Sequence, residues 1–285
     1  MPKTSARPRR SSKPKLGQHF LASESAALRI VEELGDISES TVIEIGPGRG
    51  ALTALLAQHA RRLIAIELDR VLAAQLRMQF TQTPNLEVIE GDVLSIDFDT
   101  ILGPRPGFQR PGLTLEPERA HVVGNLPYYI TSDILLHLFK YRRHFSSLVI
   151  MVQKEVADRL AAKPGTSEYG LLSATAQLYA RVEKLFTLPP GAFVPPPKVH
   201  STVVRLTIEP RLEKLLVPEN DFIQFLKLSF GQKRKTLWNN LKEEHDAGAL
   251  KAALAETGIK PTVRAEALSL ERSAALFRAL HSTVS

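Results

Sequence analysis

The stretch TVIEIGPGRG, residues 41–50, decides the fold of this chain. Apart from one acid, its first five residues are apolar or β-branched, which predicts a short buried strand. Gly46, Gly48 and Gly50 follow, and glycines at a strand-to-helix turn let the backbone approach a ligand closely. Their spacing is G-x-G-x-G, whereas dinucleotide-binding folds use G-x-G-x-x-G. The stretch therefore predicts a strand that ends in a ligand-binding turn, with a tight turn without a ligand as the alternative.

Strands and helices alternate on both sides of this turn. Short apolar runs predict further buried strands at 63–66, 86–89, 122–123 and 148–152. Ser23 and Asp69 precede amphipathic stretches and are expected to cap helices. This alternation predicts an α/β fold, with a parallel sheet and helices on both faces. The strand-like segments 182–188 and 201–208 are joined by a proline-rich turn, which predicts an antiparallel hairpin at one edge.

The last part of the chain has a different pattern. From about residue 210 apolar residues recur at helical spacing, with Phe222, Phe225 and Leu226 on one stripe. A proline-rich stretch at 103–118 interrupts the α/β pattern and is interpreted as a surface loop. We expect three parts: a basic arm over 1–14, an α/β domain over 15–209 and a small all-helical domain over 210–285.

Composition and charge restrict the possible functions. The formal net charge is +7, which favours a polyanionic partner such as nucleic acid. The absence of cysteine excludes disulfides and thiolate metal sites, and nothing points to an oxidising compartment. No apolar run reaches the roughly 18 residues that cross a bilayer. A cytoplasmic protein without membrane contact is expected.

The N-terminal arm is strongly basic, and no acid precedes Glu24. Such a segment suits contact with a phosphate backbone. An organelle transit peptide has a similar composition. The arm is favoured because the segment leads directly into a motif at Leu16.

Two acids are placed to bind a nucleoside, and a third precedes the glycine turn. Glu44 lies two residues before the first glycine of the turn. Glu67 ends the second strand and can accept hydrogen bonds from both hydroxyls of an adenosine ribose. Asp92 follows the third strand, where a carboxylate can accept from the adenine amino group. Single acids at such places are commonly caps or loop residues, but the ends of parallel strands converge on one crevice, so together they predict a ligand site.

The segment GNLPYY, residues 124–129, follows the fourth predicted strand and is the most specific motif in the chain. Adenine's exocyclic nitrogen is a poor nucleophile, because its lone pair is delocalised into the ring. The side-chain oxygen of Asn125 and the carbonyl of Leu126 can each accept one N–H of that amine and direct the lone pair toward a methyl donor. Pro127 keeps the turn out of helical geometry, and Tyr128 offers a ring face to a flipped base. An ordinary turn with a capping Asn and a core Tyr is the alternative.

These motifs resemble class I S-adenosylmethionine-dependent methyltransferases, and the Asn-Leu-Pro-Tyr variant resembles the ribosomal RNA adenine dimethyltransferase family. The resemblance implies a Rossmann-like α/β fold with a mostly parallel seven-stranded sheet, an antiparallel edge hairpin and a small all-helical C-terminal domain. It implies S-adenosyl-L-methionine as methyl donor and S-adenosyl-L-homocysteine as product. No metal is expected, because the thioether leaving group is neutral. By this resemblance the glycine turn holds the methionine part of the cofactor, Glu67 the ribose and Asp92 the adenine.

Two further segments carry the likeness. KLGQHFL, residues 15–21, matches the family's N-terminal motif, which implies that His19 and Leu21 contact the cofactor. GAFVPPPKV, residues 191–199, matches a later loop, which implies that Phe193 covers the second face of the target base, with simple burial as the alternative. The residues expected at the target are Asn125, Leu126, Pro127, Tyr128 and Phe193. Those expected at the cofactor are His19, Leu21, Glu44, Gly46, Gly48, Glu67, Asp92 and Asn125.

The C-terminal part also resembles this family. FGQKRKTL, residues 230–237, matches it, and nearby cations are candidates for RNA contact, with a solvated helix face as the alternative. These candidates are Lys227, Lys233, Arg234 and Lys235. RAEALS, residues 264–269, resembles the ending of the KsgA/RsmA type, which dimethylates two adjacent adenosines in a hairpin near the 3′ end of small-subunit (16S) ribosomal RNA. The resemblance implies a monomer that acts on this RNA, or on the assembling small subunit, during ribosome biogenesis.

Three other functions remain open. The first is Erm-type methylation of adenine in large-subunit ribosomal RNA. The second is a non-catalytic RNA-binding relative, which suits the basic arm but not the complete GNLPYY motif. The third is an NAD-dependent oxidoreductase, which accounts for the glycine turn and Glu67 but leaves that motif unexplained.

Overall fold

The computed structural model describes residues 18–103 and 119–282. The arm predicted over 1–14 lies outside the described residues. The loop predicted over 103–118 also lies outside them, apart from its first residue.

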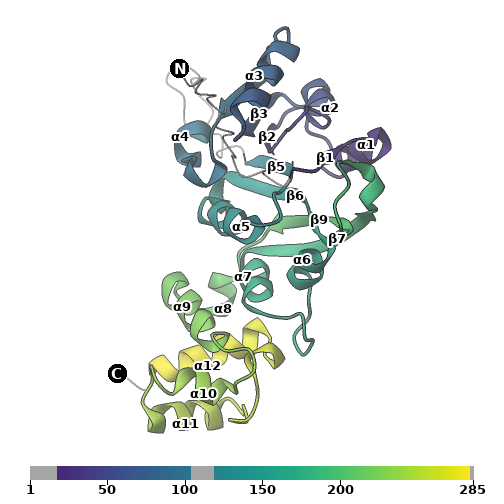
Figure 1. The fold of residues 1–285 in the computed structure, drawn as a ribbon. Helices are drawn as coiled ribbons and strands as arrows, with labels where there is room; N and C mark the ends of the chain where they lie inside the picture. Colours follow the sequence, from purple (N-terminus) through teal and green to yellow (C-terminus); the bar gives the residue numbers. More distant parts are fainter. Residues whose placement is uncertain (1–17, 104–118, 283–285) are drawn as a thin grey trace, which may run out of the picture.

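A seven-stranded sheet forms the centre of the described structure (Figure 1). In sheet order its strands are β4 (Leu86–Glu90), β3 (Arg62–Glu67), β2 (Thr41–Ile45), β5 (Ala120–Asn125), β6 (Phe145–Gln153), β9 (Ser201–Ile208) and β7 (Ala180–Leu188). The strands from β4 to β6 are parallel, and β9 is antiparallel to both β6 and β7. The predicted mostly parallel sheet with an antiparallel edge hairpin is confirmed.

A second, two-stranded sheet was not predicted. It pairs β1 (Phe20–Leu21) with β8 (Phe193–Val194) in antiparallel register. This pairing ties the N-terminal KLGQHFL motif to the later proline-rich loop, so two segments far apart in sequence meet beside the main sheet.

The helices follow the strands in the alternation expected from the sequence. Those of the α/β part are α1 (Glu24–Glu32), α2 (Thr53–His59), α3 (Arg70–Gln79), α4 (Phe98–Leu102), α5 (Thr131–Lys140), α6 (Lys154–Leu160) and α7 (Leu171–Tyr179), with the 3-10 turns η1 (Val93–Ser95), η2 (Arg142–His144) and η3 (Pro190–Ala192). Ser23 accepts the Ala26 N–H and Asp69 accepts the Val71 N–H, so both predicted caps are present.

The C-terminal helices gather below the sheet, beside α6 and α7 (Figure 1). They are α8 (Leu212–Leu215), α9 (Glu219–Ser229), α10 (Leu237–Leu241), α11 (Ala247–Glu256) and α12 (Leu270–Ser282), with the 3-10 turn η4 (Ala265–Ala267). The predicted boundary at residue 210 stays a prediction.

Apolar side chains cover both faces of the sheet. On β2, Val42 belongs to one buried cluster and its neighbour Ile43 to the other, because successive strand residues point to opposite faces. The cluster that contains Ile43 continues without a break to Phe222 and Phe277 in the C-terminal helices. The helices therefore share a core with one face of the sheet, and the opposite cluster packs beneath α1 and α2.

Leu216, between α8 and α9, adopts a left-handed backbone conformation with φ of 53°. Its N–H donates to the Glu213 carbonyl and the Val217 N–H donates to the Leu212 carbonyl, a helix-ending pattern that usually contains glycine. A Cβ is strained at positive φ, and this side chain is 73% exposed. We expect Leu216→Gly to raise the free energy of unfolding by up to about 1 kcal/mol, measured by urea unfolding.

Leu216→Ala is the matched control, because alanine removes the exposed side chain but keeps the strained Cβ. Its free energy of unfolding should stay within about 0.5 kcal/mol of the wild type. Equal stabilisation by both variants would assign the effect to the exposed leucine side chain and not to the backbone.

Candidate functional site

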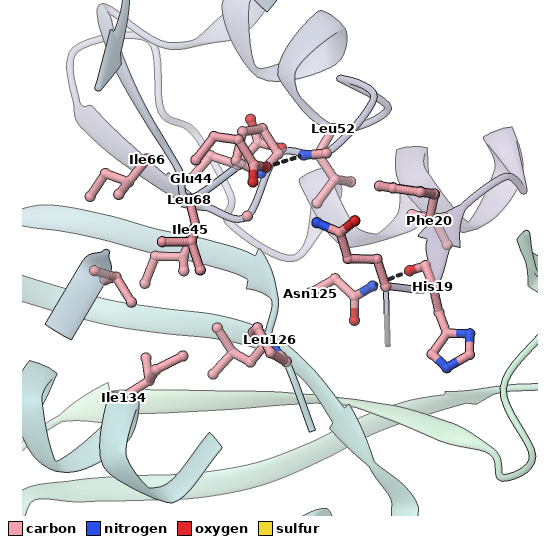
Figure 2. Close-up of a pocket in the computed structure, with 18 of the residues that line it drawn as sticks. His19, Phe20, Glu44, Ile45, Leu52, Ile66, Leu68, Asn125, Leu126 and Ile134 are labelled. Atoms are coloured by element: carbon pink, nitrogen blue, oxygen red, sulfur yellow. Dashed lines mark hydrogen bonds between the residues drawn. The ribbon is translucent and has the colours of Figure 1, made fainter. Parts of the chain in front are cut away.

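A pocket opens at the carboxyl ends of the central parallel strands (Figure 2). The sheet places these ends side by side because β4, β3, β2 and β5 are neighbours and run in the same direction. The pocket lining includes every residue expected at the target or the cofactor except Phe193, namely His19, Leu21, Glu44, Gly46, Gly48, Glu67, Asp92, Asn125, Leu126, Pro127 and Tyr128. None of the four expected RNA-binding cations lines it.

The turn after β2 has the backbone that only glycine adopts easily. Gly46, Gly48 and Gly50 have φ values of 66°, 59° and 83°. At Gly48 an added Cβ would lie 2.8 Å from a ring carbon of Phe20. The turn therefore brings its backbone against the pocket, as the sequence predicted, and Phe20 of β1 closes one side of it.

Glu67, at the end of β3, holds this turn in place. Its Oε2 accepts the Gly48 N–H and its Oε1 accepts the Asp69 N–H, both at 2.9 Å. The side chain is buried, and burial raises its pKa above the ordinary value although the two backbone donors act in the opposite direction. Since a carboxylate accepts up to about four hydrogen bonds, both oxygens retain capacity for hydroxyl donors.

Asp92 lies on the rim of the pocket and is exposed. Its Oδ1 accepts the Leu94 N–H at 3.0 Å and so caps η1. Capping is the ordinary role of an acid in this position, and it leaves the second carboxylate oxygen as the candidate acceptor for an adenine amine.

Glu44 lies deeper, on β2, and its side chain is buried. Its Oε2 accepts a hydrogen bond from Thr53 Oγ1 at 2.6 Å. Burial raises the pKa of this carboxyl to about 8, against the lowering effect of the Thr53 hydroxyl. Glu44 is therefore mostly protonated at neutral pH in the free protein.

This raised pKa predicts a pH dependence of stability. Between pH 4.5 and about 8 the folded Glu44 holds a proton that the unfolded chain releases, so its effect is to lower stability as pH rises. The slope approaches about 1.4 kcal/mol per pH unit. Glu44→Gln keeps the shape of the side chain and removes its titration. The free energy of unfolding of the variant, minus that of the wild type, should therefore increase from pH 5 to pH 8 in urea unfolding.

Glu39→Gln is the control for this experiment, because Glu39 is exposed. Its unfolding profile should run parallel to that of the wild type across the same pH range. A Glu44→Gln profile that also stays parallel would show that Glu44 ionises normally in the folded chain.

Asn125 ends β5, and its amide orientation is fixed by the N-terminal motif. Asn125 Nδ2 donates to the His19 backbone carbonyl at 2.8 Å (Figure 2). Because a carbonyl only accepts, the amide nitrogen must face His19, which leaves Oδ1 as the acceptor for another donor. The adjacent Leu126 is buried, and its N–H donates to the Met151 carbonyl at 3.1 Å.

Two contacts hold the Tyr128 side chain in place. Its hydroxyl lies 2.7 Å from Ser201 Oγ of β9, and burial raises its pKa. The His19 imidazole lies over one ring face, with centroids 5.8 Å apart and an interplanar angle of 26°. His19 Nδ1 in turn donates to the Pro195 carbonyl at 2.7 Å. A base that stacks on Tyr128 must use its other face or displace this imidazole.

Phe193 lies outside the pocket. It is 1% exposed, within the cluster that covers one face of the sheet, and it pairs with Leu21 across the two-stranded sheet. Its position is that of the burial alternative, so it supports the pocket through Leu21. The expected contact of Phe193 with a target base stays a prediction.

The expected RNA-binding cations lie on the C-terminal part of the chain. Lys227, Lys233, Arg234 and Lys235 are all exposed. Lys233 Nζ donates to the Ser167 carbonyl at 2.7 Å, which ties this basic run to the α6–α7 loop. Their contact with RNA stays a prediction.

Several residues of the site carried no signal in the sequence. Ser201 and Phe20 reach Tyr128 and Gly48 from distant parts of the sequence, and Thr53 reaches Glu44 from nine residues away. Hydroxyl and ring contacts of this kind have no spacing rule. Arg49 lies on the rim, with its guanidinium carbon 4.8 Å from the Phe20 ring centroid.

Within residues 18–103 and 119–282 no group of three or more His, Cys, Asp or Glu side chains is arranged to hold a metal ion. None of the helices described there is both long and apolar enough to cross a membrane.

Comparison with known proteins gives likenesses over nearly the whole chain. The model of the family "Ribosomal RNA adenine dimethylase" matches residues 9–282. The chain is 57% identical over 284 residues to the ribosomal RNA small subunit methyltransferase A of Koribacter versatilis, covering 98% of this chain and 99% of the relative. It is 54% identical over 269 residues to that of Acidobacterium capsulatum, covering 94% and 91%.

Solved structures share the fold. A dimethyladenosine transferase from Plasmodium falciparum superposes with a TM-score of 0.74 at 24% identity, covering 93% of this chain and 98% of that one. The 23S rRNA methyltransferase ErmE gives a TM-score of 0.68 at 25% identity, covering 92% and 99%. The predicted class I methyltransferase fold is therefore confirmed.

Proposed function

This chain belongs to the ribosomal RNA adenine dimethylase family and is a methyltransferase, and from that premise we propose which adenosines it modifies and how. It transfers methyl groups from S-adenosyl-L-methionine to the N6 atoms of two adjacent adenosines, in a hairpin near the 3′ end of small-subunit ribosomal RNA. The 57% identity to a small subunit methyltransferase A, over nearly the full length of both chains, supports the choice of subunit. The fixed amide of Asn125 is the observation that carries the chemistry.

The pocket fits S-adenosyl-L-methionine. Gly46 and Gly48 line the pocket and have no side chains, so a ligand can approach the backbone of the turn. Glu67 offers acceptors for ribose hydroxyls, and Asp92 offers one for the adenine amine. Glu44 and the glycine turn would contact the methionine part of the cofactor. When bound, the cofactor supplies an electrophilic methyl group and leaves as a neutral thioether.

The residues beyond the cofactor act on the adenine. Asn125 Oδ1 and the Leu126 carbonyl accept the two N–H groups of the amine, which orients the nitrogen lone pair for attack. The His19 carbonyl keeps the Asn125 oxygen in the accepting position, because it occupies the amide nitrogen. Tyr128 supports the flipped base by stacking, with its own ring anchored through Ser201. The product amine loses its proton readily once methylated, so the pathway needs no strong base.

The proposal includes the cellular setting. The proposal includes a monomer, as the resemblance to the family implies. The partner is the small-subunit RNA or the assembling subunit, in the cytoplasm, with Lys227, Lys233, Arg234 and Lys235 on RNA phosphates.

The test is methyl transfer from radiolabelled S-adenosyl-L-methionine to unmethylated small and large ribosomal subunits. Label in the small-subunit RNA supports the proposal. Label confined to large-subunit RNA would transfer the assignment to the Erm type, and Asn125→Ala serves as the inactive control in both reactions.

A further inference from the structure

A second pocket, of about 360 Å³, lies where the edge strand β7 meets the C-terminal helices. Three segments that are distant in sequence line it: the end of α6, the junction of α7 with β7, and the connection from β9 into α8. We name it the junction pocket, and its polar lining residues are Lys163, Gln177, Arg181, Glu209, Arg211 and Lys214. It shares no lining residue with the methyltransferase pocket.

The two arginines of the junction pocket are neutralised by acids. Arg181 lies 3.0 Å from Glu183 and 3.5 Å from Glu209, which is the only acid among the lining residues. Arg211 pairs with Glu271 on α12. These pairs hold the guanidinium groups at the wall of the pocket and leave little uncompensated charge on them.

The two lysines of the junction pocket differ from its two arginines in their ion pairing. Lys163 and Lys214 are exposed, and neither forms an ion pair with a carboxylate of the residues that the structure describes. They come from separate segments yet border one concave surface. Both lysines line the same pocket, and each ammonium group can donate three hydrogen bonds to an anion bound there. The pocket therefore has the donors and the charge for a phosphate group.

We propose that the junction pocket binds a phosphate of the RNA backbone and holds the substrate at a point separate from the methyltransferase pocket. The inference rests on the proposed RNA substrate. A polyanion suits the site because each phosphate contact releases counterions, which favours binding. A chain with a net charge of +7 gains affinity for RNA from several such contacts at once. Contacts of this kind set the position of the RNA and not its sequence preference.

The experiment compares the full-length wild type with the double variant Lys163→Gln/Lys214→Gln. Binding of unmethylated small-subunit RNA is measured over a range of salt concentrations, with cofactor affinity measured separately. The slope of log affinity against log salt should become shallower by about 0.7 to 0.9, the value for one phosphate contact. Affinity at 0.1 M salt should fall roughly 5- to 8-fold by the same relation, while cofactor affinity stays unchanged.

Lys251→Gln/Lys260→Gln is the matched control. Both of these lysines are exposed on the C-terminal part and lie outside the junction pocket. The control removes two positive charges, as the pocket variant does. Because these charges lie outside the junction pocket, the salt dependence of RNA binding should stay close to that of the wild type. A pocket variant with the wild-type slope, or a control that loses as much, would overturn the proposal.

A free anion is the other possible source of the phosphate. If inorganic phosphate at constant ionic strength raises the melting temperature of the wild type but not of the pocket variant, and the RNA slope is unchanged, the site binds a free ion and the proposal fails. Wild-type methyl transfer to ribosomal RNA separates this from the proposed function. With transfer intact and the slope unchanged, only the junction pocket is refuted.

Discussion

Asn125→Ala lowers kcat for methyl transfer by about 10²- to 10³-fold, because the target amine loses the acceptor that orients its lone pair. The structure indicates that the variant loses an acceptor for the substrate amine. The amide nitrogen is taken by the His19 carbonyl at 2.8 Å, so the oxygen alone faces the substrate. The cofactor Kd should change by less than about fivefold, because the cofactor is held mainly by the other strands. Single-turnover transfer and calorimetric binding of the cofactor measure the two effects separately.

Asn85→Ala is the structural control for this variant. Asn85 Nδ2 donates to the Ala57 and Ala60 carbonyls at 2.9 and 2.8 Å, away from the pocket. Its loss should lower stability by about 1 to 3 kcal/mol and leave kcat within about twofold. If Asn125→Ala weakens cofactor binding as strongly as it lowers kcat, Asn125 is a cofactor ligand and the orienting role is wrong.

Glu67→Ala raises the cofactor Kd by about 10- to 100-fold, because hydrogen bonds to a charged acceptor are each worth about 1.5 to 3 kcal/mol. Two effects combine in this variant. The ribose acceptor is lost, and the Gly48 and Asp69 N–H groups lose the carboxylate that holds the glycine turn. At saturating cofactor kcat should remain close to the wild-type value, the reverse of the pattern for Asn125.

Glu90→Ala is the matched control for Glu67. Glu90 ends β4, directly opposite Glu67 in the sheet register, but it is exposed and does not line the pocket. Its removal should leave the cofactor Kd unchanged. Equal weakening by both variants would assign the effect to general loss of negative charge at this end of the sheet.

The fold could be predicted because its signals are local. The run 41–45 became β2 with the predicted bounds, and the other parallel strands appeared around their apolar centres. β6 shows the limit: it extends from Phe145 to Gln153, beyond the apolar run 148–152, since pairing with β5 and β9 decides where a strand ends. The two-residue strands β1 and β8 have no periodicity at all, because only their mutual contact defines them.

The candidate site could be predicted as a set of residues but not as a set of contacts. Glu44, Glu67, Asp92 and Asn125 converge because the ends of parallel strands must converge. Their hydrogen-bond partners depend on which backbone groups lie within about 3 Å, and the sequence does not contain that distance. Phe193 illustrates the difference: the motif match predicts a contact with the target base, which stays a prediction, but it does not reveal the pairing with Leu21 or the burial outside the pocket.

The central claim is dimethylation of two adjacent adenosines near the 3′ end of small-subunit RNA. Nucleoside mass spectrometry of that 3′ fragment, after incubation of unmethylated small subunits with the protein and S-adenosyl-L-methionine, tests it most directly. We expect N6,N6-dimethyladenosine at two neighbouring positions with the wild type and unmodified adenosine with Asn125→Ala. Unmodified adenosine in that fragment with the wild type, under conditions in which the protein methylates another RNA, would contradict it.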